Sequence, residues 1–492
     1  MKKTLISLAL MLAPALACAQ STVISNVKGY TLKDNRLQTF NAIEFQDDSI
    51  IRLYQNGDKL PDIKDKETRH IDGQGKTLLP GLIDAHGHVL GYGLSLLRAD
   101  LTTSHSEADA AKRVLDYAEK NQQLTWLQGR GWNQVRWPGK SFPTAASLDK
   151  YFPDRPVWLR RIDGHAGWAN SKAMVLAGIT KDTVSPAGGE IIRDKEGNAS
   201  GVFIDNAMTL IESKIPPLTM AEQKTILVKA MHALAAVGLT SVHDAGISVA
   251  NLQAYQVLSK AQQMPIRVNA MLDITDSQWR DVLRKGPKRS QDDFFKMDSV
   301  KVVADGALGS RGAALIEDYS DHHGHKGLLL YSDDKLLEVM KSAMDAGFQV
   351  NTHAIGDDAN KRVLDNYQQL LVSKDKRALR HRIEHAQVLN LSDIPRFSQL
   401  GVIASMQATH ATSDKNMAQD RLGKDRIAGA YAWQKLLKSG ATLAAGSDFP
   451  IESPNPFYGL HASITRQDHL NLPEGGWFAD EKMTRLQAFK SF

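Results

Sequence analysis

The sequence predicts an α/β protein built around a (β/α)8 barrel, with a small β unit before it. From residue 80 onward, short runs rich in β-branched residues alternate with stretches of helical hydrophobic spacing, which is typical of parallel βα units. The 492 residues suffice for such a barrel with additions, and 42% hydrophobic residues supply a sizeable core. Because the active site of this fold lies at the C-terminal ends of the strands, polar residues at those ends are the candidates for function.

The first residues are typical of an export signal. Two lysines precede an apolar stretch at residues 4–16, which is short for a membrane span, and an Ala-Cys-Ala run at 17–19 offers a cleavage site before Gln20. We therefore expect residues 1–19 to be a signal peptide and the protein to be exported to the periplasm. Lipid anchoring at Cys18 is an alternative that the preceding residues disfavour.

Composition narrows the partners and the chemistry. The net charge of +5 is small and dispersed, so it gives no reason to expect nucleic acid or a membrane surface. Cys18 is the only cysteine, so the mature chain would have no disulfide and no cysteine nucleophile, and any metal would be held by nitrogen and oxygen. A small molecule is the expected partner, and a homodimer is left open.

The pattern of predicted strands and helices divides the chain into two parts after the expected signal peptide. Residues 20–79 alternate short β-like runs with turns and predict a small β unit, while residues 80–492 predict the barrel. More strands are predicted than the barrel needs, so residues from about 122 to 217 are expected to form an insertion that caps its mouth. The clearest helices are residues 219–237 and 334–346, each closed by a glycine. The predicted strands after residue 78 are 79–88, 125–129, 157–160, 239–243, 266–270, 300–304, 348–353, 381–385, 402–406 and 442–448.

The first barrel strand ends in His86 and His88. Successive side chains of a strand alternate between its faces, so residues spaced i, i+2 point the same way. Two such imidazoles can hold one divalent ion between them. A single His-x-His is also typical of an ordinary half-buried strand end, so the interpretation of His86 and His88 depends on residues later in the chain.

Four later strand ends carry residues of the same kind: Lys301, His353, His385 and Asp448. A lysine flanked by valines in a buried parallel strand is costly unless it has a partner or a function. Taken singly, the lysine could extend to solvent, either histidine could be a hydrogen-bonded core residue, and the aspartate could cap a turn. Their occurrence in order, each on its own strand end, favours one shared site.

Weaker candidates lie in the loops and the insertion. His165 is a candidate substrate contact, although a local hydrogen-bonding role is an alternative. Arg311, in a glycine-rich loop, could bind a substrate carboxylate through both guanidinium arms. His243-Asp244 also ends a strand, where a structural pair is the favoured interpretation. Trp132 and Trp137 are expected to pack inside the insertion.

Several stretches resemble the amidohydrolase superfamily. Residues 80–88 (Pro-Gly-Leu-Ile-Asp-Ala-His-Gly-His) resemble its first-strand signature. More narrowly, the chain is similar to the branch that includes the N-substituted formamide deformylases, and the similarity runs in order from about Val23 to the end. The stretches that carry this narrower resemblance are residues 131–137, 161–171, 301–311, 352–357, 382–385 and 446–450.

This resemblance implies a distorted (β/α)8 barrel with a β-sandwich built from both ends of the chain. It also implies a metal centre of one or two ions, in which a lysine carboxylated by carbon dioxide bridges the pair as a carbamate. The implied ligands are His86, His88 and Asp448 for one ion, His353 and His385 for the second, and Lys301 as the bridge.

The chemistry expected of such a centre is hydrolysis of carbon–nitrogen bonds other than peptide bonds, through a metal-activated hydroxide. Asp448 would take the proton from the attacking oxygen and deliver it to the leaving nitrogen. Zinc suits imidazole and carboxylate ligands, with manganese and iron as alternatives. The competing functions are an esterase, lactonase or phosphotriesterase on the same centre, and an exported binding protein without turnover.

In the resembling family the chain returns after the last barrel helix to complete the β-sandwich. Here residues 482–492 predict an amphipathic helix at which the sequence stops. We hypothesise that the C-terminal half of the β-sandwich is missing and that stability suffers.

Overall fold

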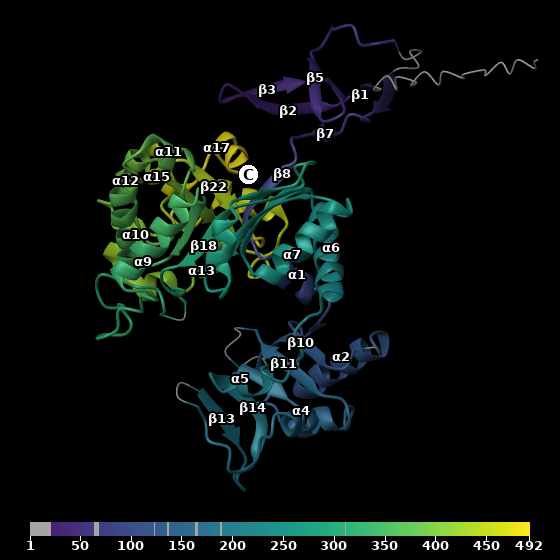
Figure 1. Cartoon of the computed structure of the whole chain (residues 1–492), viewed down its shortest axis with the longest axis vertical. Helices are drawn as coiled ribbons and strands as arrows, with labels where there is room; N and C mark the ends of the chain where they lie inside the picture. The colour runs from purple at the N-terminus through teal and green to yellow at the C-terminus, as the bar shows by residue number, and fades with distance from the viewer. Residues whose placement is uncertain are drawn as a thin grey trace, which may run out of the picture. The chain divides into compact units, whose positions relative to one another are not determined.

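The computed structural model describes residues 21–492 except 63–67, 123, 135–136, 163–165, 187–188 and 310. The export signal expected at residues 1–19 lies outside this part. The chain divides into two compact units, Met1–Leu82 and Ile83–Phe492, which are described separately (Figure 1). Among the described residues, no helix has both the length and the apolar character that a bilayer span requires.

The N-terminal unit is a β domain, as the sequence predicts. One sheet has four strands in the order β5-β4-β1-β6 and another has three in the order β3-β2-β7. Val23, Ala42 and Tyr54 form a small core in this unit. The strands are β1 (Ser21–Ser25), β2 (Lys28–Lys33), β3 (Arg36–Phe40), β4 (Ala42–Gln46), β5 (Ser49–Tyr54), β6 (Thr68–Asp72) and β7 (Thr77–Leu78).

The second unit contains the predicted eight-stranded parallel barrel. Its strands follow each other around the sheet in chain order, from β8 to β22, and a short strand β17 (Lys288–Arg289) pairs with β18 outside this path. Each barrel strand falls within or overlaps a run that the sequence predicts. The strands are β8 (Leu82–Gly87), β15 (Leu239–Ile247), β16 (Arg267–Asp273), β18 (Phe295–Val303), β19 (Gln349–Ala354), β20 (Arg382–His385), β21 (Ile403–Gln407) and β22 (Leu443–Gly446).

Helices surround these strands, and in Figure 1 α9, α10 and α12 lie outside them. Helix α6 begins after Thr219, whose side chain and Glu222 form a reciprocal capping box, and it ends just before Gly238. The two helices predicted most clearly, at residues 219–237 and 334–346, are confirmed as α6 and α9. The helices of the barrel are α1 (Val89–Ser95), α6 (Met220–Ala236), α7 (Val249–Lys260), α8 (Trp279–Arg284), α9 (Asp333–Asp345), α10 (Asp357–Leu370), α11 (Lys374–Ala378), α12 (Ile394–Leu400), α13 (Ala408–Asp414), α14 (Ala418–Arg426), α15 (Trp433–Lys438), α16 (Pro456–Thr465) and α17 (Arg485–Ser491).

A separate sheet forms between β8 and α6, in the order β13-β14-β12-β11-β10-β9. Trp132, Trp137 and Trp168 lie in one of its two cores, as expected for the first two. The sheet begins upstream of residue 122, and its expected function as a cap stays a prediction. Its elements are β9 (Ala99–Asp100), α2 (Glu107–Lys120), β10 (Leu127–Trp132), α3 (Ala145–Asp149), β11 (Val157–Arg161), β12 (Ala166–Ala169), α4 (Ser171–Leu176), β13 (Gly189–Arg193), β14 (Ala199–Asp205) and α5 (Met208–Glu212).

The barrel closes where the first strand meets the last. Asp448 N donates to His86 O at 2.7 Å, and His88 N donates to Phe449 O at 2.8 Å. The buried Asp84 carboxylate reinforces this closure, because it accepts hydrogen bonds from His86 N (3.0 Å) and from Ser447 Oγ (2.6 Å). The closure therefore places the two histidines of the first strand beside the aspartate that follows the last.

Gly446 leaves no room for a side chain at this closure. A Cβ atom there would lie 2.5 Å from His86 N and 2.8 Å from Asp84 Oδ1. We expect Gly446→Ala to destabilise the barrel by about 1–3 kcal/mol, because the closure must open to relieve the clash. A fall in melting temperature measures this. Gly91→Ala is the matched control, since its Cβ would make only ordinary contacts at 3.6 Å, and an equal loss in both variants would contradict the explanation.

Candidate metal centre

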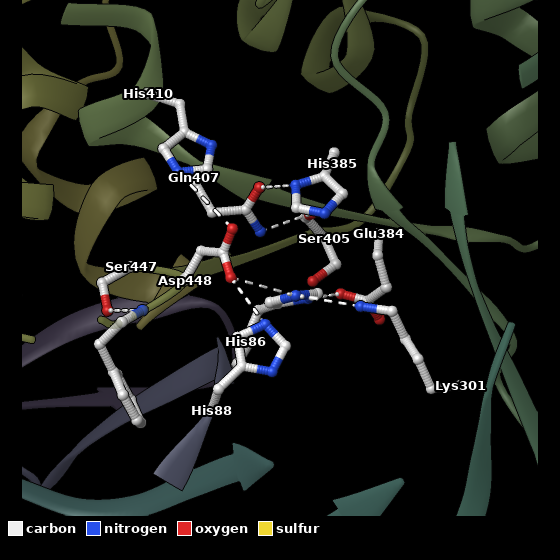
Figure 2. Close-up of polar contacts among 12 residues, drawn as sticks. His86, His88, Lys301, Glu384, His385, Ser405, Gln407, His410, Ser447 and Asp448 are labelled. Carbon is white, nitrogen blue, oxygen red and sulfur yellow. Dashed lines mark hydrogen bonds and ion pairs between the residues drawn. The ribbon is translucent and has the colours of Figure 1, made fainter. Parts of the chain in front are cut away.

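The predicted residues of the first and last strands meet at the barrel closure. His88 Nε2 lies 3.0 Å and His86 Nε2 lies 3.6 Å from the same oxygen, Oδ1 of Asp448 (Figure 2). His86 is fully buried, whereas the side chain of His88 is 36% exposed. The cluster is therefore closed toward the barrel interior and open to solvent at His88.

The other three predicted ligands adjoin this cluster. Lys301 Nζ, on β18, lies 3.2 Å from His86 Nε2. The ring centroid of His385 lies 4.9 Å from that of His86 and 4.5 Å from that of His353. The structure thus gathers all six residues at the C-terminal ends of five strands, while their roles as ligands stay predictions.

Two groups of donors in this cluster suit a metal ion: His86, His88 and Asp448, and His385, His410 and Asp448. In each group the donor atoms lie within 4.8 Å of one another. Bonds of about 2.0–2.1 Å in a tetrahedral site place neighbouring donors about 3.4 Å apart. The 3.0 and 3.6 Å separations around Asp448 Oδ1 match that spacing, so the residues present fit a divalent ion.

A buried carboxylate orients His86. His86 Nδ1 donates to Glu384 Oε2 at 2.5 Å, so Nε2, which Lys301 Nζ faces at 3.2 Å, is the ring nitrogen whose lone pair points into the cluster. Burial, followed by the nearby Lys301 charge, lowers the pKa of His86 to about 4, so the ring is neutral at neutral pH. Burial alone would raise the pKa of Glu384, but Arg382 and His86 hold it well below its usual range.

Arg382 in turn secures Glu384. Its guanidinium lies 2.5 Å from Glu384 Oε1 and donates to Ala85 O at 2.8 Å and to His243 Nδ1 at 2.8 Å. Burial, followed by Arg382, lowers the pKa of His243 to about 3, which keeps its ring neutral and able to accept. His243 therefore lies behind the cluster as a structural partner, while Asp244 accepts from Val89 N at 3.1 Å.

A second buried carboxylate supports His353. Asp305 accepts the amide hydrogens of Ile355 at 3.0 Å and Gly356 at 2.8 Å, in the loop that follows His353. Asp305 Oδ1 also lies 3.4 Å from His353 Nε2. His353 Nε2 therefore faces Asp305, whereas His353 Nδ1 does not.

The structure describes only Arg311 of the two residues predicted to contact a substrate. Arg311 is paired with Asp321 through Nε at 3.1 Å and Nη2 at 2.9 Å, so this side of its guanidinium already has a carboxylate partner. His165 lies outside the described residues. Contact of either residue with a substrate stays a prediction.

Three further residues of the site, Arg382, Glu384 and His410, were not among those predicted from the sequence. Arg382 and Glu384 are buried charges spaced i, i+2 in a parallel strand, the same signal that identifies Lys301, so they could have been found. His410 lies in helix α13 rather than at a strand end, and a sequence pattern based on strand ends cannot find it.

We expect Glu384→Gln to weaken metal binding about 10- to 100-fold, because the neutral amide no longer fixes the tautomer and orientation of His86. Competition with a chromogenic chelator measures the dissociation constant. Glu338→Gln is the matched control, since this exposed carboxylate lies on helix α9, where it pairs with Arg280 and Lys335. Unchanged metal affinity in Glu384→Gln, with native folding, would contradict the assignment.

Comparisons with known proteins agree with this geometry. A profile described as the amidohydrolase family matches residues 69–492. Putative amidohydrolase YtcJ of Bacillus subtilis (strain 168) is 33% identical over 412 residues, which are 82% of this chain and 75% of that protein. N-substituted formamide deformylase of Arthrobacter pascens is 24% identical over 439 residues, which are 86% of this chain and 79% of that protein.

A solved structure has the same fold. The crystal structure of an uncharacterized metal-dependent hydrolase from Pyrococcus horikoshii OT3 superposes with a TM-score of 0.77 at 24% sequence identity, and the match covers 95% of this chain and 91% of that one. The family profile covers most of the chain, and a relative that is 33% identical aligns with 82% of it. This chain is therefore a hydrolase that belongs to the amidohydrolase family.

Proposed function

We propose that this hydrolase cleaves a carbon–nitrogen bond of the amide type, outside peptides, in a small-molecule substrate, with a divalent metal, zinc, as its cofactor. The observation that carries the proposal is the approach of His86 Nε2 and His88 Nε2 to one oxygen of Asp448. A deformylase of N-substituted formamides among the relatives supports the choice of bond. A bound divalent ion would lower the pKa of water and polarise a substrate carbonyl.

Asp448 is the proposed proton carrier. Its Oδ1 faces His86 and His88, while its Oδ2 faces away from them, toward His410. That outer oxygen can accept the proton of the attacking water and pass it to the leaving nitrogen, so that an amine leaves and a carboxylate remains. Glu384 keeps His86 oriented throughout, while burial keeps the His86 ring neutral.

We further propose that Lys301 carries a carbamate and that His353 and His385 contribute to a second ion. Burial lowers the pKa of the Lys301 amine, partly offset by Glu384 and Asp448, and the neutral amine is the form that combines with carbon dioxide. The reaction releases one proton and turns a buried amine into an anionic oxygen donor. This change would remove the cost of a buried lysine beside His86.

A substrate panel tests the choice of bond. We expect N-substituted formamides or simple N-acyl amines to be cleaved with a higher kcat/KM than an ester, a lactone or a phosphotriester. A chelator should abolish this activity and zinc should restore it. Asp448→Asn should lower kcat about 10²- to 10⁴-fold because the proton carrier is lost.

Faster cleavage of every ester, lactone or phosphotriester than of any amide would assign the centre to those substrates instead. Metal-loaded protein that turns over none of the compounds would favour an exported binding protein.

Intact mass under native conditions tests two further proposals at once. We propose that the protein is exported to the periplasm, and cleavage before Gln20 predicts the mass of residues 20–492. A carbamate on Lys301 predicts one additional carbon dioxide, which denaturation in acid removes and which Lys301→Met lacks. The full-length mass would contradict export, and an unmodified mass in metal-loaded protein would contradict the carbamate.

A further inference from the structure

The carboxylate of Asp448 faces two groups of histidines. Its Oδ1 faces His86 and His88, and its Oδ2 lies 3.7 Å from His410 Nε2 (Figure 2). We propose that His410 binds the second divalent ion together with His385, on the side of Asp448 that Oδ2 faces, so that Oδ2 lies beside the ion and stays available to carry the proton. This inference rests on the proposed metal-dependent function and adds to it a ligand, His410, that no strand-end pattern predicts.

The spacing of the donors supports this site. The donor atoms of His385, His410 and Asp448 lie within 4.8 Å of one another, as do those of the group around His86 and His88. His410 Nε2 lies 3.7 Å from Asp448 Oδ2, so an ion bound to this nitrogen would lie beside the proposed proton carrier.

In the second group, the tautomer of His385 is also fixed. His385 Nδ1 donates to Gln407 Oε1 at 2.7 Å, and Gln407 Nε2 donates to Ser405 O at 3.2 Å, which sets the orientation of the amide. Nε2 is therefore the nitrogen of His385 whose lone pair an ion can use, as it is in His86. Gln407 ends β21 and His410 follows in the first turn of α13, so one short segment places both groups.

The nitrogen of His410 that faces Asp448 is buried without a hydrogen bond. Within the part of the chain that the structure describes, His410 Nε2 has no hydrogen-bond partner, and only 13% of the side chain is exposed. A buried polar nitrogen without a partner is costly, so such a group in a native protein calls for a ligand. The ring of His410 lies nearly parallel to that of His385, at 13° and 6.1 Å between centroids. An ion beside Asp448 would satisfy its Nε2.

His353 is the competing ligand for the second ion. Its ring lies closer to that of His385, at 4.5 Å, and its Nε2, 3.4 Å from Asp305 Oδ1, likewise makes no hydrogen bond among the described residues. His353 and His410 both adjoin His385, and the proposal makes His410 indispensable to the second ion whether or not His353 also binds it.

Ion counting in full-length variants tests this without any substrate. We expect wild-type protein, saturated with zinc and freed of excess by gel filtration, to retain two ions per chain by elemental analysis. His410→Ala should retain one, and His410→Gln should behave the same way. His232→Ala, a histidine exposed on α6, is the matched control and should retain two. The ion that remains in His410→Ala shows that the cluster around His86 is still folded.

Two ions in His410→Ala would overturn the proposal, and loss of the second ion only in His353→Ala would assign it to His353. One ion in the wild type would also overturn it. Because no turnover is measured, these outcomes are independent of the substrate panel: two ions without amide cleavage would refute the proposed function and leave the site intact.

Discussion

The closure of the barrel between β8 and β22 is the constraint on which the rest of this structure depends. Residues from the two ends of the barrel sequence become neighbours there through backbone hydrogen bonds, which Asp84 reinforces by linking Ser447 to the backbone of His86. Burial, opposed mainly by the hydrogen bond from Ser447, raises the pKa of Asp84 to about 7, which shows how far this carboxyl lies from water. The closure in turn sets the distance between the two histidines of the first strand and Asp448.

Behind the closure, buried charges are arranged so that each has a partner. Arg382 neutralises Glu384, and Glu384 accepts from His86, which leaves the metal-facing nitrogen of that ring unprotonated. Lys301 Nζ faces that nitrogen, His86 Nε2, at 3.2 Å. Such a network is favourable only when every member is satisfied, and an ion or a carbamate would complete the part of it that faces the strand ends.

The backbone at the strand ends is also adapted to the site. His385 and Asp448 have left-handed backbone conformations, with φ of 73° and 60°, which residues other than glycine seldom adopt. Strain of this kind persists where the surrounding contacts fix the residue, here the bond from His385 to Gln407 and the closure around Asp448. Both residues belong to the donor group that includes His410, so their strained conformations and the chemistry of the site coincide.

The sequence by itself predicted the α/β barrel and six candidate residues at strand ends, because strand periodicity is a local pattern and active sites of this fold lie at the C-terminal ends of its strands. Only the tertiary structure revealed His410, which reaches the cluster from a helix, and the pairing of Arg311 with Asp321, which occupies an arginine that looked free. It also showed that Arg382 and Glu384 act together with His86. Local pattern predicts which way a side chain points from its strand, but the partner it meets depends on how distant segments pack.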